Sequence, residues 1–182
     1  LSSKNLSQDT IINLEIKSTP DEKNLTPNPK EMVQIVLNDI KKSNLQDKII
    51  ISSFDWRILR EVKNQSPEIS RAYLTFQQEK GMKIKKTIYS KSPWIDHIPL
   101  TIVYDLPKII KELGGSAWHP YYKDINKKAV KDAHDYNLPV NVWTVNDEYN
   151  MLKMIEYEVD GIMTDYPLKL KELCDKKNIK WF

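Results

Sequence analysis

The carboxyl-terminal part of the chain alternates short apolar runs with helix-forming segments, and this alternation restricts the possible folds more than any other feature. A β-branched and aromatic run at 140–145 ends on Asn146, which suits the cap of a following helix. A second apolar run at 161–164 ends on Asp165, another expected capping residue, and Pro167 begins the next helix. Because parallel neighbouring strands require a crossover connection of this size, the pattern predicts a parallel α/β sheet.

The first strand expected in the chain, residues 11–17, alternates with a period of two. Its even-numbered residues are apolar and its odd-numbered residues from 13 to 17 are polar, so the two kinds of side chain lie on opposite faces. In an α/β sheet the apolar face meets the helices, and Glu15 and Lys17 then face a barrel lumen or a cleft. The alternative is an edge strand of an antiparallel sheet with one face in water.

The alternation of strands and helices continues through the middle of the chain. Further strands are expected at 48–54, 71–76 and 116–120, and further helices at 28–40, 55–62, 105–114 and 125–136. Between about 77 and 104 the periodicity fails over a proline-bearing stretch, which indicates an irregular excursion forming part of a rim or lid. About six strands thus alternate with helices in a single domain over residues 1–182. A TIM (β/α)₈ barrel has eight strands and about 250 residues, so this pattern predicts a partial barrel lacking its first two strands.

Charge and hydropathy argue against several classes of protein. The 182 residues carry 28 Lys and Arg against 25 Asp and Glu, and this net charge of +3 forms no basic block, so no nucleic-acid partner is indicated. No apolar run reaches the roughly 18 to 20 residues that span a bilayer, so no membrane span is expected. The single cysteine, Cys174, excludes an internal disulfide and is expected as a buried structural thiol. The chain begins with Leu1, and its compartment stays open, with the cytoplasm favoured.

Three stretches together resemble the glycerophosphodiester phosphodiesterase family. They are Asn-Leu-Glu-Ile-Lys at 13–17, Val-Trp-Thr-Val-Asn at 142–146 and Val-Asp-Gly-Ile-Met-Thr-Asp-Tyr-Pro at 159–167, supported by Ile-Ser-Ser-Phe at 51–54 and Ala-His at 133–134. The resemblance implies a phosphodiesterase-type barrel whose mouth binds one divalent cation, Mg²⁺ or Ca²⁺. It also implies hydrolysis of a small-molecule glycerophosphodiester to glycerol 3-phosphate and an alcohol.

Carried over residue by residue, the resemblance implies roles for four side chains. Glu15 matches a carboxylate ligand of the cation, and Lys17 matches a lysine that faces the substrate phosphate. Phe54 and Trp143 match apolar residues of the pocket wall that contact the glycerol or alcohol portion. From the residues alone, Glu15 and Lys17 could instead form a solvated ion pair, and Trp143 could belong to the core.

No catalytic residue is expected within this chain. The two catalytic histidines of the family and its other metal acids match positions upstream of Leu1, and none of His97, His119 and His134 takes their place. His119 is expected as a hydrogen-bonded structural residue, with a place at the mouth of the site as the alternative. We therefore expect these residues alone to be inactive and to bind a cation poorly, because hard divalent cations take six or more oxygen ligands. A missing amino-terminal barrel segment or a partner chain is needed to close the sheet.

Two other functions remain open. The first is a non-catalytic barrel relative that acts as a binding domain, and a His-Arg pair with a Glu-x-Asp motif upstream would argue for the enzyme instead. The second is a related barrel phospholipase, which is disfavoured because the segments around 144–146 and 164–167 fit the glycerophosphodiester phosphodiesterases better.

Overall fold

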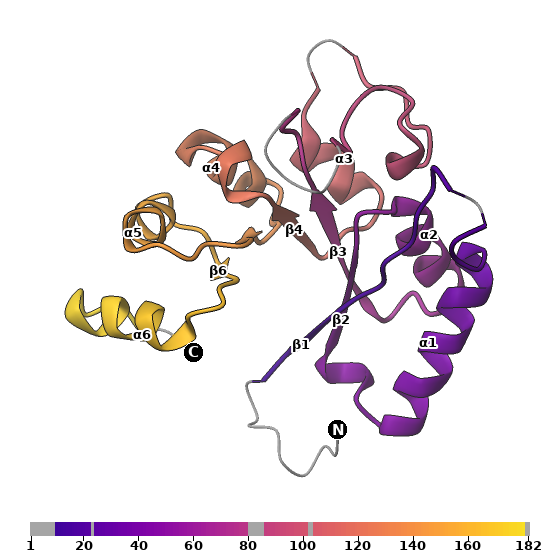
Figure 1. Cartoon of the computed structure of the whole chain (residues 1–182), viewed down its shortest axis with the longest axis horizontal. Helices are drawn as coiled ribbons and strands as arrows, with labels where there is room; N and C mark the ends of the chain where they lie inside the picture. The colour runs from indigo at the N-terminus through magenta and orange to yellow at the C-terminus, as the bar shows by residue number, and fades with distance from the viewer. Residues whose placement is uncertain (1–9, 23, 80–85, 102–103, 181–182) are drawn as a thin grey trace.

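Six strands and six α-helices alternate along the part of the chain that the computed structural model describes, residues 10–22, 24–79, 86–101 and 104–180 (Figure 1). The strands are β1 (Ile12–Glu15), β2 (Ile49–Ser53), β3 (Ser70–Thr75), β4 (Ala117–Pro120), β5 (Asn141–Val142) and β6 (Gly161–Ile162). The helices are α1 (Pro29–Ser43), α2 (Trp56–Gln65), α3 (Leu106–Glu112), α4 (Lys127–Asp135), α5 (Glu148–Glu156) and α6 (Pro167–Lys176). Short 3₁₀ turns are η2 (Gln46–Lys48), η3 (Pro93–Ile95) and η4 (Tyr122–Asp124).

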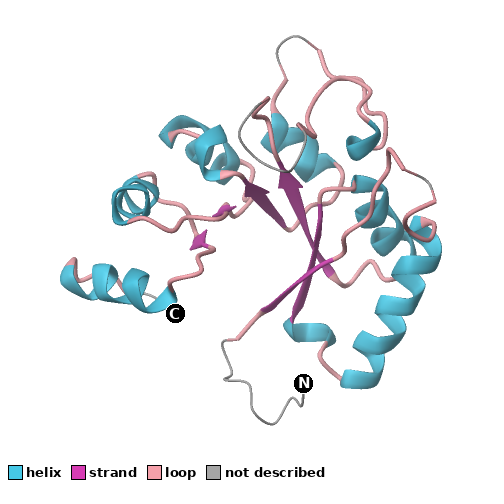
Figure 2. Ribbon diagram, in the orientation of Figure 1, coloured by secondary structure: helices cyan, strands magenta, loops and turns pink. Residues whose placement is uncertain are grey.

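All strand pairs among the described residues are parallel and follow chain order. Strands β1 to β4 form one sheet, and β5 pairs with β6. Isolated parallel bridges from Trp118 to Val140 and from Tyr121 to Trp143 connect β4 to β5. The predicted parallel sheet is therefore confirmed, and the antiparallel alternative for β1 is excluded. Figure 2 shows the helices arranged around the strands, which is the order expected when each helix connects two parallel neighbours.

The strand register decides which side chains share the inner face of the sheet. Glu15 on β1 lies opposite Ser52 on β2, Ser52 lies opposite Ala72 on β3, and Ala72 lies opposite Ala117 on β4. Since paired residues in a parallel sheet point to the same side, these four side chains form one row. The neighbouring Ile16 is buried on the opposite face, as the alternation of residues 11–17 predicts.

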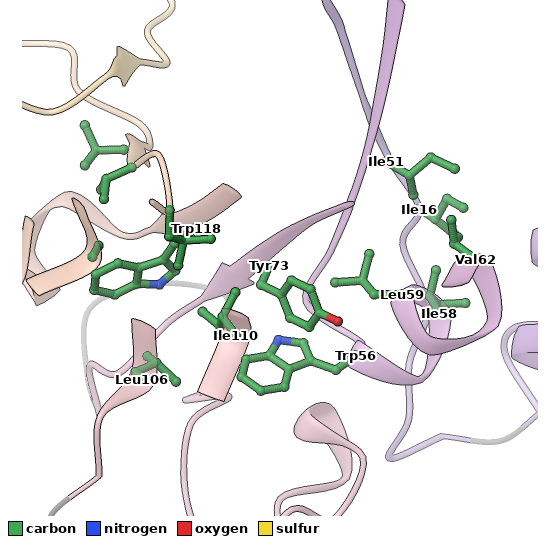
Figure 3. Packing of buried hydrophobic residues seen from close by; sticks show 14 of the residues in the cluster. Ile16, Ile51, Trp56, Ile58, Leu59, Val62, Tyr73, Leu106, Ile110 and Trp118 are labelled. Carbon is green, nitrogen blue, oxygen red and sulfur yellow. The ribbon is translucent and has the colours of Figure 1, made fainter. Parts of the chain in front are cut away.

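The main core fills the space between the strands and the helices (Figure 3). Ile16, directly after β1, and Ile51 of β2 pack there with Leu59 of α2. The indole of Trp56 meets the ring of Tyr73 edge-on, with ring centroids 5.0 Å apart. Each fully buried large side chain stabilises the fold by about 1.5 to 3 kcal/mol, so this layer fixes the helices to the sheet and leaves the inner face to other side chains.

Three of the predicted helices begin at a side-chain cap. The side chains of Asn28, Asp55 and Asp105 accept hydrogen bonds from backbone amides in the first turns of α1, α2 and α3. These bonds satisfy amides that have no partner within the helix, which explains why short polar residues mark each start.

Two predicted caps are wrong. Asp147, and not Asn146, caps α5 by accepting from the amide of Asn150, and α6 begins after Tyr166 without a side-chain cap from Asp165. Asn146 Nδ2 instead donates to Asp165 Oδ2 at 2.7 Å, and Asn146 Oδ1 accepts from the Asp165 amide at 3.0 Å. The two side chains join the loops that follow β5 and β6, where both strands end.

The excursion between β3 and α3 has η3 as its regular element within the described residues. Its start is fixed by Asp124, which accepts from the Gln77 amide at 2.7 Å and from the side chain of Gln78. Among the described residues, no helix is both long enough and apolar enough to cross a bilayer. Within the same residues, the outer edges of β1 and β6 pair with no further strand.

Candidate functional site

A cavity of about 350 Å³ opens where β1 and β2 end, and three of the four predicted site residues line it. Glu15, Lys17 and Phe54 all belong to its wall. Lys17 Nζ lies 3.7 Å from Glu15 Oε2, and their side chains are 80% and 30% exposed. In parallel α/β proteins, ligands bind at this carboxyl end of the strands, so the position suits a functional site.

Backbone pairing between β1 and β2 positions these side chains. The amide of Ile16 donates to the carbonyl of Ser52 at 2.9 Å, and Ser53 Oγ donates to the carbonyl of Ile16 at 2.7 Å. Ile16 is thereby fixed in the core, and its two neighbours along the strand, Glu15 and Lys17, must turn to the other side. The ion pair that they form at the surface contributes little stability by itself.

Trp143 packs against Phe54, a residue of the cavity wall. Its indole stands edge-on to the ring of Phe54, with centroids 5.3 Å apart, and also packs against Tyr121 and Phe76. Trp143 Nε1 donates to the carbonyl of His119 at 2.8 Å, and the residue is 7% exposed. Trp143 is not among the residues that line the cavity, so its contact with a substrate stays a prediction.

The cavity lining includes the buried carboxylate of Asp55, and both of its oxygens accept hydrogen bonds from the protein. Asp55 accepts hydrogen bonds from Arg57 Nε at 2.9 Å, from Arg57 Nη2 at 2.7 Å and from Ser18 Oγ at 2.5 Å. The side-chain hydrogen bond between Arg57 and Asp55 and the negative charge of Asp55 raise the pKa of Arg57. Asp55 therefore acts as a structural anchor between the β1–α1 loop and α2, and its oxygens are not available to a ligand.

None of the three histidines lines the cavity. His119 is buried on β4, and Asn141 Nδ2 lies 3.0 Å from its Nε2, whereas its Nδ1 has no hydrogen-bond partner among the described residues, so its structural role stays a prediction. Burial lowers the pKa of His119 to about 4. His97 lies in the excursion with Nδ1 3.2 Å from the carbonyl of Lys91, and His134 Nε2 lies 2.8 Å from Asp160 Oδ2.

The described residues do not make a complete metal centre. No group of three or more His, Cys, Asp or Glu side chains that could hold a metal ion occurs among them. Hard divalent cations require six or more oxygen ligands, usually from several carboxylates. Glu15 faces the inner side and can supply one such oxygen ligand, so a cation bound here needs ligands from outside the described residues.

Asp21 and Trp94 are among the cavity residues that the sequence-based prediction missed. Asp21, in the loop after β1, and Trp94, in η3, both line the cavity, and Trp94 Nε1 donates to Asp21 Oδ2 at 3.1 Å. The residues lie 73 positions apart in irregular segments, so no periodicity relates them. The sequence feature that could have indicated a site residue here is a large aromatic residue, Trp94, in an otherwise polar, proline-bearing loop.

The chain is similar to proteins of one family along most of its length. The sequence profile of the glycerophosphoryl diester phosphodiesterase family matches residues 2–169. A glycerophosphodiester phosphodiesterase from Caldanaerobacter subterraneus is 30% identical over 170 residues, which are 93% of this chain and 57% of that protein. The chain thus spans little more than half the length of this curated relative.

Solved structures agree with this match. The crystal structure of a proposed glycerophosphoryl diester phosphodiesterase from Silicibacter pomeroyi is 30% identical, with a TM-score of 0.76 over 94% of this chain and 52% of that one. A phosphodiesterase from Oleispira antarctica, 23% identical, has a TM-score of 0.66 over 91% of this chain and 55% of that one. These neighbours are TIM barrels, and the six parallel strands described here form part of such a barrel. The chain belongs to the glycerophosphoryl diester phosphodiesterase family.

Proposed function

We propose that the complete protein hydrolyses glycerophosphodiesters to glycerol 3-phosphate and an alcohol. The observation that carries this proposal is the shared cavity of Glu15, Lys17 and Phe54 at the carboxyl ends of parallel strands. The family match supports the reaction class. The Oleispira antarctica phosphodiesterase was solved with its product sn-glycerol-3-phosphate, and we assign the same product to this protein.

The cavity residues suit the parts of such a substrate. The ammonium of Lys17 is largely exposed and can approach a phosphate oxygen, where it would offset the negative charge that grows during hydrolysis. The ring of Phe54 offers an apolar surface to the glycerol or alcohol portion. We assign Glu15 as one carboxylate ligand of a divalent cation, Mg²⁺ or Ca²⁺, whose remaining ligands lie outside the described residues.

We further propose that the isolated residues 1–182 are inactive. The described part of the chain brings no histidine to the cavity, and it contains no group of three or more side chains that could hold a metal ion, whereas a cation needs several oxygen ligands. The outer edges of β1 and β6, which pair with no further strand within the described part of the chain, also need neighbours. A further barrel segment, or a partner chain, would supply both the edges and the missing groups.

Hydrolysis assays on the complete protein and on residues 1–182 test these proposals together. Release of glycerol 3-phosphate from a glycerophosphodiester is expected from the complete protein, with loss on chelation and recovery on addition of Mg²⁺ or Ca²⁺. Turnover by the isolated residues would contradict the proposed need for further groups. Substrate binding by the complete protein without any turnover would instead indicate a non-catalytic binding domain, and cleavage of intact phospholipid would indicate a barrel phospholipase.

A further inference from the structure

The backbone ladder between β4 and β5 is interrupted. Two isolated bridges, from Trp118 to Val140 and from Tyr121 to Trp143, join these strands in place of a continuous ladder. Pro120 lies between the bridges and has no amide hydrogen to donate to β5. Side-chain contacts across this gap therefore contribute to the position of β5 and of Trp143, which follows it.

Two hydrogen bonds of His119 cross the gap. Asn141 Nδ2 lies 3.0 Å from His119 Nε2, and Trp143 Nε1 donates to the carbonyl of His119 at 2.8 Å. Because an amide NH₂ group can only donate, Nε2 is the acceptor, and the neutral ring carries its proton on Nδ1. His119 thus holds both Asn141 and Trp143, which are two residues apart and face the same side of the strand.

The amide of Asn141 is confined on its other side by β6. Strands β5 and β6 pair at Asn141 and Gly161. A Cβ atom at Gly161 would lie 2.4 Å from Asn141 Oδ1, so a larger residue there would displace the amide. Glycine at this position therefore leaves the space from which Asn141 reaches His119.

Packing alone does not explain the imidazole of His119. The residue is 1% exposed, and its Nδ1 has no hydrogen-bond partner among the described residues. A buried donor without an acceptor is destabilising, and an apolar side chain of similar size would avoid this penalty. Burial also keeps the ring neutral, since it lowers the pKa of His119 to about 4. A neutral imidazole here suits a residue whose role is its hydrogen bond to Asn141.

We infer that His119 is a positioning residue for the substrate pocket, which holds Trp143, and through it Phe54, by its hydrogen bond to Asn141. The inference rests on the proposed function and adds to it a residue that does not line the cavity. Trp143 stands edge-on to Phe54 with ring centroids 5.3 Å apart, and Phe54 belongs to the cavity wall. Loss of the bond should therefore displace this wall and weaken substrate binding, while the reacting groups keep their places.

Two substitutions of His119 in the complete protein separate this role from packing. His119→Gln keeps an acceptor at the position of Nε2, whereas the shorter side chain of His119→Asn does not reach Asn141. KM for a glycerophosphodiester should rise about fivefold in His119→Asn, the effect of one neutral hydrogen bond, with kcat within about twofold of the natural protein. His119→Gln should restore KM to within about twofold. An unchanged KM in His119→Asn, or the same increase in both variants, would overturn the inference.

A double variant tests whether His119 and Asn141 act through one bond. Asn141→Ala should raise KM as His119→Asn does, and the two substitutions together should raise it no further. Effects that multiply in the double variant would show that the two residues act independently, and the inference would then be wrong.

Hydrogen exchange at the Trp143 indole separates this inference from the proposed reaction, because it requires no turnover. The Trp143 Nε1 hydrogen of the complete protein, assigned by its absence in Trp143→Phe, should exchange at least about threefold faster in His119→Asn than in His119→Gln or the natural protein. Equal exchange rates would overturn the positioning role whatever the enzyme hydrolyses. If exchange quickens as expected but no glycerophosphodiester is cleaved, the proposed reaction is wrong and the positioning of Trp143 by His119 stands.

Discussion

The ring of Phe54 stands edge-on to the indole of Trp143, with centroids 5.3 Å apart, and thereby connects the cavity at β1 and β2 to the aromatic cluster at β4 and β5. Phe54 lines the cavity that holds Glu15, whereas Trp143 packs against Phe54 without lining the cavity. The wall of the site therefore depends on a buried residue from a distant part of the chain.

Removal of the Trp143 indole is expected to destabilise the protein. Trp143→Ala leaves a void against Phe54 and removes the bond from Nε1 to the carbonyl of His119, so it should cost about 3 to 5 kcal/mol. Trp143→Phe keeps a ring in the cluster and should cost clearly less. Urea unfolding of the complete protein measures both changes, and equal losses for the two variants would show that the indole has no specific role.

Removal of the Asp55 carboxylate is expected to destabilise the folded protein strongly. Asp55→Ala removes the cap of α2 and leaves the half-buried guanidinium of Arg57 and the buried hydroxyl of Ser18 without their acceptor, so a loss of about 3 to 5 kcal/mol is expected. Asp55→Asn keeps one acceptor oxygen and the cap and should lose less. Thermal unfolding of the complete protein checks this order, which a smaller loss for Asp55→Ala would contradict.

Burial of His119 predicts a dependence of stability on pH. Its pKa falls from 6.5 to about 4 in the folded protein, so between these values the unfolded chain binds a proton that the folded protein does not. Stability therefore falls as the pH drops below 6.5, and this residue accounts for about 2 kcal/mol between pH 7 and pH 5. Urea unfolding at the two pH values should show a smaller decrease in His119→Asn than in the natural protein, and equal decreases would exclude the assignment.

The link between Asn146 and Asp165 predicts a second effect on stability. Asn146→Ala leaves the Asp165 amide and the hydroxyl of Thr164 without their acceptor, which should cost about 1 to 2 kcal/mol. Asn146→Asp keeps an acceptor but places a second carboxylate beside Asp165, so it should be destabilising at neutral pH and less so in acid. Measurement of both variants across pH distinguishes a lost hydrogen bond from charge repulsion.

The alternation of strands and helices could be predicted because each strand shows an apolar run and most helices begin at a short polar residue. The inner position of Glu15 followed from the two-residue period of β1 alone. The predicted capping roles of Asn146 and Asp165 are wrong, because the fold brings their loops together and the two side chains form a hydrogen bond with each other. Asp21 and Trp94 meet through irregular segments, where neither periodicity nor spacing indicates a contact.

Cation affinity tests the central claim most directly, namely that Glu15 faces the inner side of the barrel and ligates a divalent cation. Calorimetric titration of the complete protein with Mg²⁺ and Ca²⁺ should show a loss of at least about tenfold in affinity for Glu15→Gln, because one charged oxygen ligand is removed. Glu68→Gln removes the same charge from an exposed position just before β3 and serves as the control, with no change expected. Equal affinities for Glu15→Gln and the natural protein would contradict the account.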